Sequence, residues 1–165
     1  MTKMLIYIVM SGKMGVSTRA RYALRMMVRL ARQSGASATV PYLSRAEDIS
    51  QPYAAQLMMA MRRAGLVTSR RGGGGGVILA RPPAEVSVAD VIEAADGPIH
   101  VVECDVDGVA CRRQSRCVTR AVWEEAGTRL KAYFGSVTLA ALVARAEALD
   151  GKSGVPPDSL KADIR

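Results

Sequence analysis

Hydrophobic side chains recur at helical spacing from residue 18 to residue 33, in a stretch without glycine or proline. Apolar positions three and four residues apart share one face of a helix. Here they are Leu24, Met27, Val28 and Ala31. Ser17 or Thr18 is a suitable N-cap, and Gly35 follows the last periodic residue. The pattern predicts a helix with one buried face and a separate stripe of arginines.

Two shorter helices are predicted next, over residues 41–48 and 51–64. Ser50 can cap the second one, and Pro52 is tolerated in its first turn because that N–H lacks an intrahelical partner. Gly65 is a natural residue to end it. Its expected core face consists of Ala54, Leu57, Met58 and Met61. A tight connection between two helices, the second starting with polar residues, is typical of a helix-turn-helix.

A β-hairpin is predicted directly after this pair. Its strands are LVTSRR (66–71) and VILA (77–80), and its tip is GGGGG (72–76). A hairpin in this place is the wing of a winged helix-turn-helix. The glycine run is not followed by a helix and lacks the Lys-Ser/Thr ending of a phosphate-binding loop, so a nucleotide site is not predicted.

The second half of the chain is predicted to be helical around a loop. Ser87 and Asp90 form a capping-box pair that opens a helix over 87–96. Its expected core face is Val88, Val91, Ile92 and Ala95. Along 118–137 the apolar positions step by three and four, which favours a subunit interface over packing within one domain. They are Trp123, Ala126, Leu130, Tyr133 and Val137.

The predicted fold is therefore mainly α with a small β-hairpin wing: a winged helix-turn-helix DNA-binding domain followed by a long dimerisation helix. The expected divisions are an N-terminal extension or misassigned start (1–13), the DNA-binding domain (14–99), a cysteine loop (100–120), the dimerisation helix and a following helix (118–149), and a mobile tail (150–165).

The excess of positive over negative charge lies in one segment. The chain has a net charge of +8, and residues 17–83 hold eleven arginines, no lysine and two acids. Arginine makes forked contacts to phosphate, which favours nucleic acid over a solvated basic surface. The longest apolar run, residues 4–10, is far shorter than the roughly 20 residues of a membrane helix, so no membrane partner is expected.

All three cysteines lie in one short segment, as Cys104, Cys111 and Cys117. Thiolates are the usual ligands of iron–sulfur clusters, and nearby cations offset their charge. The closely spaced cysteine pairs of a zinc site are absent. Clustered cysteines without a convincing signal peptide favour the reducing cytoplasm. No cysteine–histidine–acid arrangement is visible, so an enzyme is not predicted.

Over about residues 14 to 145 the order of motifs resembles the Rrf-type winged-helix regulators. The matching pieces are STRARYALR, DIS-x-x-Y-x-x-QL, MRRAGLV, RGGGGG and VADVIEAADGP, followed by one cysteine and then two more. The resemblance implies a homodimer that binds double-stranded DNA at a pseudo-palindromic operator. The two recognition helices of such dimers lie about one duplex turn, ~34 Å, apart.

The resemblance also implies which residues meet DNA. Gln51, Tyr53 and Gln56 correspond to the exposed start of the recognition helix, and a glutamine amide can pair with an adenine edge. Arg71 corresponds to a wing arginine that enters the minor groove. The full expected set is Ser50, Gln51, Tyr53, Gln56, Arg62, Arg63, Arg70 and Arg71.

In this family, three cysteines hold an iron–sulfur cluster with a variable fourth ligand. A [2Fe-2S] cluster is favoured here and a [4Fe-4S] cluster is the alternative. Some members use a histidine where this chain has Arg120, and others use an aspartate where it has Arg21. His100 is the candidate fourth ligand. The alternatives are a small exogenous thiol or one of three acids, Glu103, Asp105 and Asp107.

The expected function is a cluster-dependent transcriptional regulator, acting as a repressor and sensing iron, iron–sulfur status, redox state or nitric oxide. One alternative is a winged-helix regulator without metal that senses oxidants through its cysteine thiols. Another is an iron–sulfur carrier or redox protein that does not bind DNA.

Overall fold

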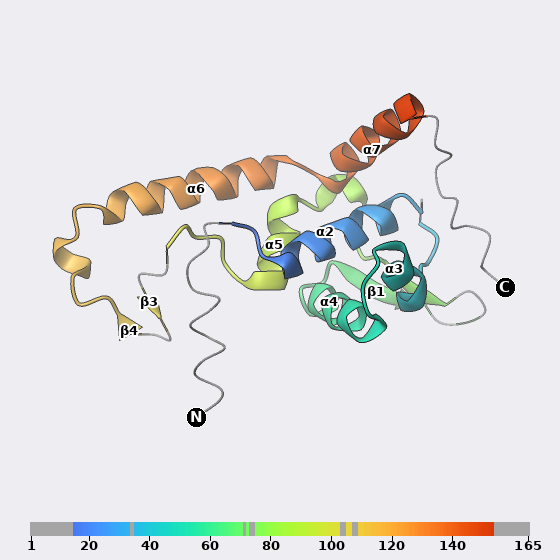
Figure 1. Cartoon of the computed structure of the whole chain (residues 1–165), viewed down its shortest axis with the longest axis horizontal. Helices are drawn as coiled ribbons and strands as arrows, with labels where there is room; N and C mark the ends of the chain where they lie inside the picture. Colours follow the sequence, from blue (N-terminus) through green and yellow to red (C-terminus); the bar gives the residue numbers. More distant parts are fainter. Residues whose placement is uncertain are drawn as a thin grey trace.

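The computed structural model confirms a mainly helical chain with one β-hairpin wing (Figure 1). It describes residues 15–33, 35–70, 72, 75–102, 105–106 and 109–153. The predicted N-terminal extension, most of the predicted tail, Arg71 and Cys104 lie outside these residues.

The elements are, in chain order, α2 (Thr18–Ala31), α3 (Val40–Ala46), α4 (Gln51–Arg63), β1 (Val67–Arg70), β2 (Gly76–Leu79), the 3-10 turn η1 (Pro83–Glu85), α5 (Val88–Asp96), β3 (Asp105–Val106), β4 (Val109–Ala110), the 3-10 turn η2 (Gln114–Arg116), α6 (Arg120–Ser136) and α7 (Leu139–Ser153).

Helix α2 is the centre of the winged domain. Its N-cap is Ser17, whose hydroxyl accepts a hydrogen bond from the Ala20 N–H at 3.0 Å. The predicted core face is partly wrong, because Leu24 and Val28 are only half-buried. The buried positions are Ala20, Ala23, Met26, Met27, Leu30 and Ala31. Helices α4, α5 and α7 and strand β2 contact α2 from several sides, so its buried surface is wider than a single stripe.

The connection between α3 and α4 is short because Asp48 adopts a left-handed backbone, with φ of 52°. This conformation lets the Asp48 N–H donate to the Arg45 carbonyl and the Ile49 N–H donate to the Ser44 carbonyl, at 3.2 and 3.0 Å. These two bonds are those of a Schellman C-cap. The chain then turns at once into α4, whose N-cap is Ser50 as predicted.

The same motif ends α4 at Gly65, where φ is 70°. The Gly65 N–H donates to the Arg62 carbonyl and the Leu66 N–H donates to the Met61 carbonyl, at 3.0 and 2.9 Å. Leu66 is buried and leads directly into β1. The predicted role of Gly65 is confirmed.

Substitution of Gly65 by alanine is expected to lower the free energy of unfolding by about 1 kcal/mol, because a Cβ is disfavoured in the left-handed region. The matched control is Gly135→Ala in α6, where a Cβ meets no neighbouring atom within 4 Å. There the same change is expected to add about 0.5 kcal/mol through helix propensity. Urea unfolding at one protein concentration measures both, and equal effects would contradict the role of Gly65.

The wing is a hairpin held against the segment that precedes α3. Strands β1 and β2 pair antiparallel, with Val67 opposite Leu79 and Arg70 opposite Gly76. On its other edge β2 bridges to Ala38, with N–H···O distances of 3.0 and 2.8 Å between Ala38 and Val77. A Cβ at Gly76 would collide with the Ala38 carbonyl, so this close approach requires glycine.

Helix α5 completes the core under α2. Its predicted capping box is confirmed: the Ser87 hydroxyl accepts from the Asp90 N–H at 3.1 Å, and the Asp90 carboxylate accepts from the Ser87 N–H at 2.8 Å. Its predicted core residues are all buried, namely Val88, Val91, Ile92 and Ala95. The helix ends at Gly97, with φ of 91°.

Helix α6 leaves the winged domain as a long arm (Figure 1). Its middle and C-terminal parts are anchored: the buried Gly127 lies beside the backbone of residues 99–101, Lys131 pairs with Glu93 of α5 at 2.8 Å, and Phe134 packs against the core. Its other end reaches the segment of β3, β4 and η2 (Figure 1). The arm therefore connects the cysteine loop to the DNA-binding domain.

Helix α7 returns over the winged domain and is longer than predicted. It runs to Ser153, four residues into the segment predicted as a tail. Arg32 of α2 pairs with Asp150 at 2.5 Å, which explains why the helix continues past residue 149. Within the described residues, no helix has both the length and the apolar composition required to cross a bilayer.

Candidate DNA-binding face and cysteine loop

Helix α4 presents one buried and one exposed face. The predicted core residues are all buried: Ala54, Leu57, Met58 and Met61. The exposed residues are Gln51, Pro52, Gln56, Met59, Arg62 and Arg63. The face that carries the predicted base-reading glutamines is therefore open to a partner.

Two further residues of the predicted DNA-binding set stand at the start of α4. The Ser50 hydroxyl accepts from the Tyr53 N–H at 3.4 Å and so caps the helix. The Tyr53 ring is half-buried and meets the Tyr22 ring edge-on, with centroids 6.2 Å apart. Ser50 therefore caps the first turn of α4, and Tyr53 also positions this turn against α2.

The predicted phosphate-binding arginines lie along the end of α4 and the wing. Arg63 and Arg70 are exposed. Arg62 donates a hydrogen bond to the Ser69 hydroxyl of β1 and so ties α4 to the wing. Arg71 is outside the described residues. The structure brings Arg62, Arg63 and Arg70 to the junction of recognition helix and wing.

A buried ion pair missed by the sequence analysis fixes α3 on α2. The Glu47 side chain is 3% exposed, and its two oxygens meet Arg25 Nε at 2.5 Å and Arg29 Nε at 2.8 Å. Burial by itself lowers the pKa of Arg29, but the hydrogen bond and negative charge of Glu47 outweigh it and raise that pKa. Two arginines of the basic segment therefore serve the fold, and Arg32 is paired with Asp150.

Two of the three cysteines lie in the described part of the loop, and both are free thiols. Cys111 is exposed and Cys117 is half-buried, three residues before α6 begins at Arg120. The Cys117 Sγ lies 3.3 Å from the Thr119 hydroxyl. Hydrogen bonds from Thr119, aided by the charge of Arg113, lower the pKa of Cys117. A lower pKa favours the thiolate, which is the form that binds metals.

The complete ligand set is not assembled within the described residues, because Cys104, Glu103 and Asp107 fall outside them. In the part that is described, no three side chains among His, Cys, Asp and Glu lie close enough to hold a metal ion. His100 is exposed, and its backbone passes beside Gly127 of α6. Two free thiols, one with a lowered pKa, fit a thiolate-bound cluster chemically, and the roles of Cys104 and His100 stay predictions.

An exposed apolar surface follows α6. Trp123 is 37% exposed and Tyr133 is 59% exposed, while Ala126 and Val137 of the predicted seam are half-buried. The large apolar side chains exposed from residue 118 to residue 133 are Val118, Val122, Trp123, Leu130 and Tyr133. Apolar side chains concentrated on one arm mark an interaction surface.

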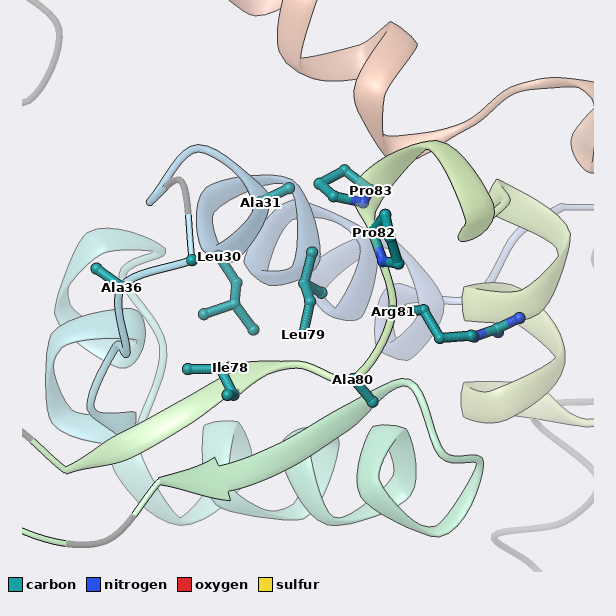
Figure 2. A pocket seen from close by; sticks show the side chains of 10 residues that line it. Leu30, Ala31, Ala36, Ile78, Leu79, Ala80, Arg81, Pro82 and Pro83 are labelled. Carbon is teal, nitrogen blue, oxygen red and sulfur yellow. The ribbon is translucent and has the colours of Figure 1, made fainter.

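A shallow hollow of about 370 Å³ lies away from these residues, between the end of α2, strand β2 and the Arg81–Pro83 segment (Figure 2). Its lining is Leu30, Ala31, Gly35, Ala36, Ile78, Leu79, Ala80, Arg81, Pro82 and Pro83. It contains none of the predicted DNA-binding residues or cysteines. Arg81 is the only lining side chain with a charge.

The tight α3–α4 pair, the exposed face of α4 and the β1–β2 wing define a winged helix-turn-helix DNA-binding regulator. Residues 16–145 match the Rrf2 family, described as "Iron-dependent Transcriptional regulator". The chain belongs to this family, which confirms the resemblance seen in its sequence.

Individual relatives agree with this assignment. The HTH-type transcriptional regulator IscR of Escherichia coli is 34% identical over 139 residues, which cover 83% of this chain and 85% of IscR. The structure of T. potens IscR matches with a TM-score of 0.66 and 32% identity, covering 82% of this chain and 90% of that one. CymR, the global cysteine regulator of B. subtilis, matches with a TM-score of 0.64 and 30% identity, covering 81% and 98%.

Proposed function

We propose that the protein is a homodimeric repressor whose affinity for its operator depends on an iron–sulfur cluster bound by Cys104, Cys111 and Cys117. The observation that carries this proposal is the position of the cysteine loop. Cys117 lies three residues before α6, and α6 is anchored on the core of the winged domain at its other end. A change at the cysteines can therefore alter the direction of the arm that joins two DNA-binding domains.

Dimer formation is supported by the exposed apolar surface of α6. This surface includes the only tryptophan of the chain, and a second copy of the same helix would cover it. In a two-fold dimer the two α4 helices enter successive major grooves ~34 Å apart. The corresponding operator is pseudo-palindromic.

Base recognition is assigned to Gln51 and Gln56 on the exposed face of α4, because glutamine can bond to both acceptor and donor of an adenine edge. Arg63 and Arg70, with Arg71, supply phosphate or minor-groove contacts that position the domain. Ser50 and Tyr53 hold the first turn of α4 in place. This division separates residues that read sequence from residues that supply affinity.

Within the cysteine loop, the lowered pKa of Cys117 favours the thiolate needed for ligation. Arg112, Arg113 and Arg116 lie in the same loop and would offset the negative charge of thiolate ligands. A bound [2Fe-2S] cluster would supply a group that is lost or altered by oxidants, nitric oxide or low iron. Ligand binding shifts an equilibrium only through different affinities for its two states, so the apo and holo forms must bind DNA differently.

Selection of duplexes from a random library under anaerobic conditions tests the DNA-binding half of the proposal. The expected result is enrichment of inverted repeats whose half-site centres are about 10 base pairs apart. Their affinity should fall steeply with salt, because bound arginines release counterions from the phosphates. Enrichment of no common sequence, or of a single unrepeated site, would contradict a dimeric operator-binding protein.

Substitution of Arg63 by alanine is expected to weaken binding to all duplexes to a similar extent. The slope of log K against log salt concentration should become smaller by about one per Arg63, or about two for the dimer. The control is Arg129→Ala in α6, where the guanidinium pairs with Glu125 at 2.6 Å. Binding titrations at several salt concentrations measure both. An unchanged slope for Arg63→Ala would remove this residue from the phosphate contacts.

A second candidate function keeps DNA binding and replaces the cluster by thiol chemistry. It is favoured by the two free thiols and by the similarity to CymR, the global cysteine regulator of B. subtilis. Two thiols would give two protons and two electrons to hydrogen peroxide, which is reduced to two molecules of water as the disulfide forms. Protein purified without oxygen is expected to be brown under the first proposal and colourless under the second.

A further inference from the structure

Met59 occupies the centre of the exposed face of α4. Leu57 and Met61, two residues before and after it, are fully buried, and a step of two residues turns a helix by about 200°. Met59 therefore projects on the side opposite the core. It lies three residues after Gln56 and eight after Gln51, on the face assigned to base recognition.

The exposure of Met59 is unusual within the described part of this chain. Met59 is 55% exposed, whereas Met26, Met27, Met58 and Met61 are buried. Its exposed neighbours include Gln51, Gln56, Arg62 and Arg63. Because Met59 does not pack in the core, its exposed side chain does not contribute to the hydrophobic packing of the isolated domain.

Met59 is also separate from the apolar surface of α6. Figure 1 shows α4 and α6 on opposite sides of α2 and α5. The exposed apolar residues that run from 118 to 133 all belong to the arm and its start. A dimer formed through α6 therefore leaves Met59 uncovered, and its partner is to be found on the DNA side.

We propose that Met59 is a specificity-determining residue that contacts the C5-methyl group of a thymine in the major groove. The methyl group is the apolar feature that thymine presents there, and apolar side chains recognise it. The flexible, polarisable thioether of methionine adapts to such a contact. This inference rests on the proposed function, in which α4 lies in the major groove.

The geometry of α4 also indicates where that thymine lies relative to the adenine bound by Gln56. Gln56 and Met59 are separated by three residues, a rise of about 4.5 Å along α4, and successive base pairs are about 3.4 Å apart. An adenine bound by Gln56 and a thymine touching Met59 thus stand within one or two base steps. The inferred half-site contains both, and the symmetric half-site repeats them.

The test replaces single thymines by deoxyuridine, which removes the C5-methyl and keeps every hydrogen-bonding group. The probe is the duplex selected from the random library by the wild-type protein. Each buried methyl group contributes about 0.8 kcal/mol, which corresponds to about fourfold in affinity. For the wild-type protein, deoxyuridine at the contacted thymine of one half-site should therefore weaken binding about fourfold. The same substitution in both half-sites should weaken it about 15-fold. Fluorescence anisotropy measures the dissociation constants.

The Met59→Ala variant is expected to bind the thymine duplex more weakly and to lose the difference between thymine and deoxyuridine at that position. Leu149→Ala is the matched control, because Leu149 is 67% exposed on α7, outside the DNA-binding face. It should retain both the affinity and the full deoxyuridine effect. Thermal unfolding of both variants should stay close to wild type.

Two results would overturn the inference. One is a Met59→Ala protein that keeps the wild-type penalty for deoxyuridine, and the other is a wild-type protein that is insensitive to deoxyuridine at every thymine. Either result can be told apart from failure of the proposed function. If the proposed function fails, the selection from the random library, which precedes this test, yields no operator.

Discussion

Replacement of Cys111 by alanine is expected to abolish the bound iron and acid-labile sulfide and the visible absorption of anaerobically purified protein. The chain has only three cysteines, so this change leaves two thiolates, fewer than a cluster normally receives from its protein. Cys111 is exposed and lies outside the hydrophobic core, so folding should be unaffected. Dimerisation should also persist, since the proposed interface lies on α6.

The matched control for Cys111→Ala is Ser115→Ala, an exposed hydroxyl in the same loop. It removes one heavy atom from a similar position and should retain the full iron and sulfide content. Circular dichroism and size-exclusion chromatography report whether either variant is misfolded. A Cys111→Ala protein with the wild-type spectrum and iron content would remove Cys111 from the ligand set.

Replacement of Glu47 by alanine is expected to lower the free energy of unfolding by about 3 kcal/mol, the lower end of the range for breaking a buried ion pair. The lower end applies because the Arg25 side chain is 60% exposed and can return to water. Arg29 is more enclosed and loses the acceptor of its Nε hydrogen bond. Since Glu47 ends α3 beside the turn into α4, the recognition helix should also lose its fixed position, and operator affinity should fall.

The control for Glu47→Ala is Glu124→Ala on α6. Glu124 pairs with Arg120 at 2.5 Å, but this pair lies on the surface, where such contacts contribute less than about 1 kcal/mol. Denaturant unfolding should be compared at one protein concentration, because dimerisation makes apparent stability concentration-dependent. Equal stability losses in the two variants would show that Glu47 is not a structural link between α2 and α3.

The ends of the helices could be predicted from the sequence, because each cap depends only on residues within one helical turn. Ser17, Ser50 and the Ser87–Asp90 pair cap helices as predicted, and Gly65 ends α4. The exposed position of Met59 also follows from helical periodicity, since it lies outside the buried stripe of α4. The stripe by itself defines only the core, so it does not assign a role to the exposed Met59.

Features that depend on distant parts of the chain could not be predicted. Glu47 meets arginines 18 and 22 residues earlier, and nothing in the local sequence distinguishes it from a solvated acid. The Asp150-Gly151 pair resembles a helix end, but Asp150 binds Arg32, 118 residues away, and α7 continues. The spacing within α2 predicts one buried stripe that includes Leu24 and Val28, whereas elements packed on several sides of the helix bury a different set of positions.

In the cysteine loop, too, some features can be predicted from the sequence and others depend on the folded structure. The three cysteines and their spacing are properties of the sequence and can be read directly from it. The hydrogen bond of Thr119 to Cys117, which lowers the pKa of that thiol, depends on how the loop enters α6. The chemistry of the thiols is therefore tied to the start of the helix that the proposed switch must move.

The decisive measurement of cluster-dependent DNA binding is the affinity of one protein preparation for its selected operator before and after removal of the cluster. The measurement is made anaerobically, and iron and sulfide are determined in the same samples. We expect iron and sulfide in the untreated protein and about a tenfold or larger change in the dissociation constant, equivalent to 1.4 kcal/mol. Equal affinities for the iron-containing and iron-free protein would contradict this expectation.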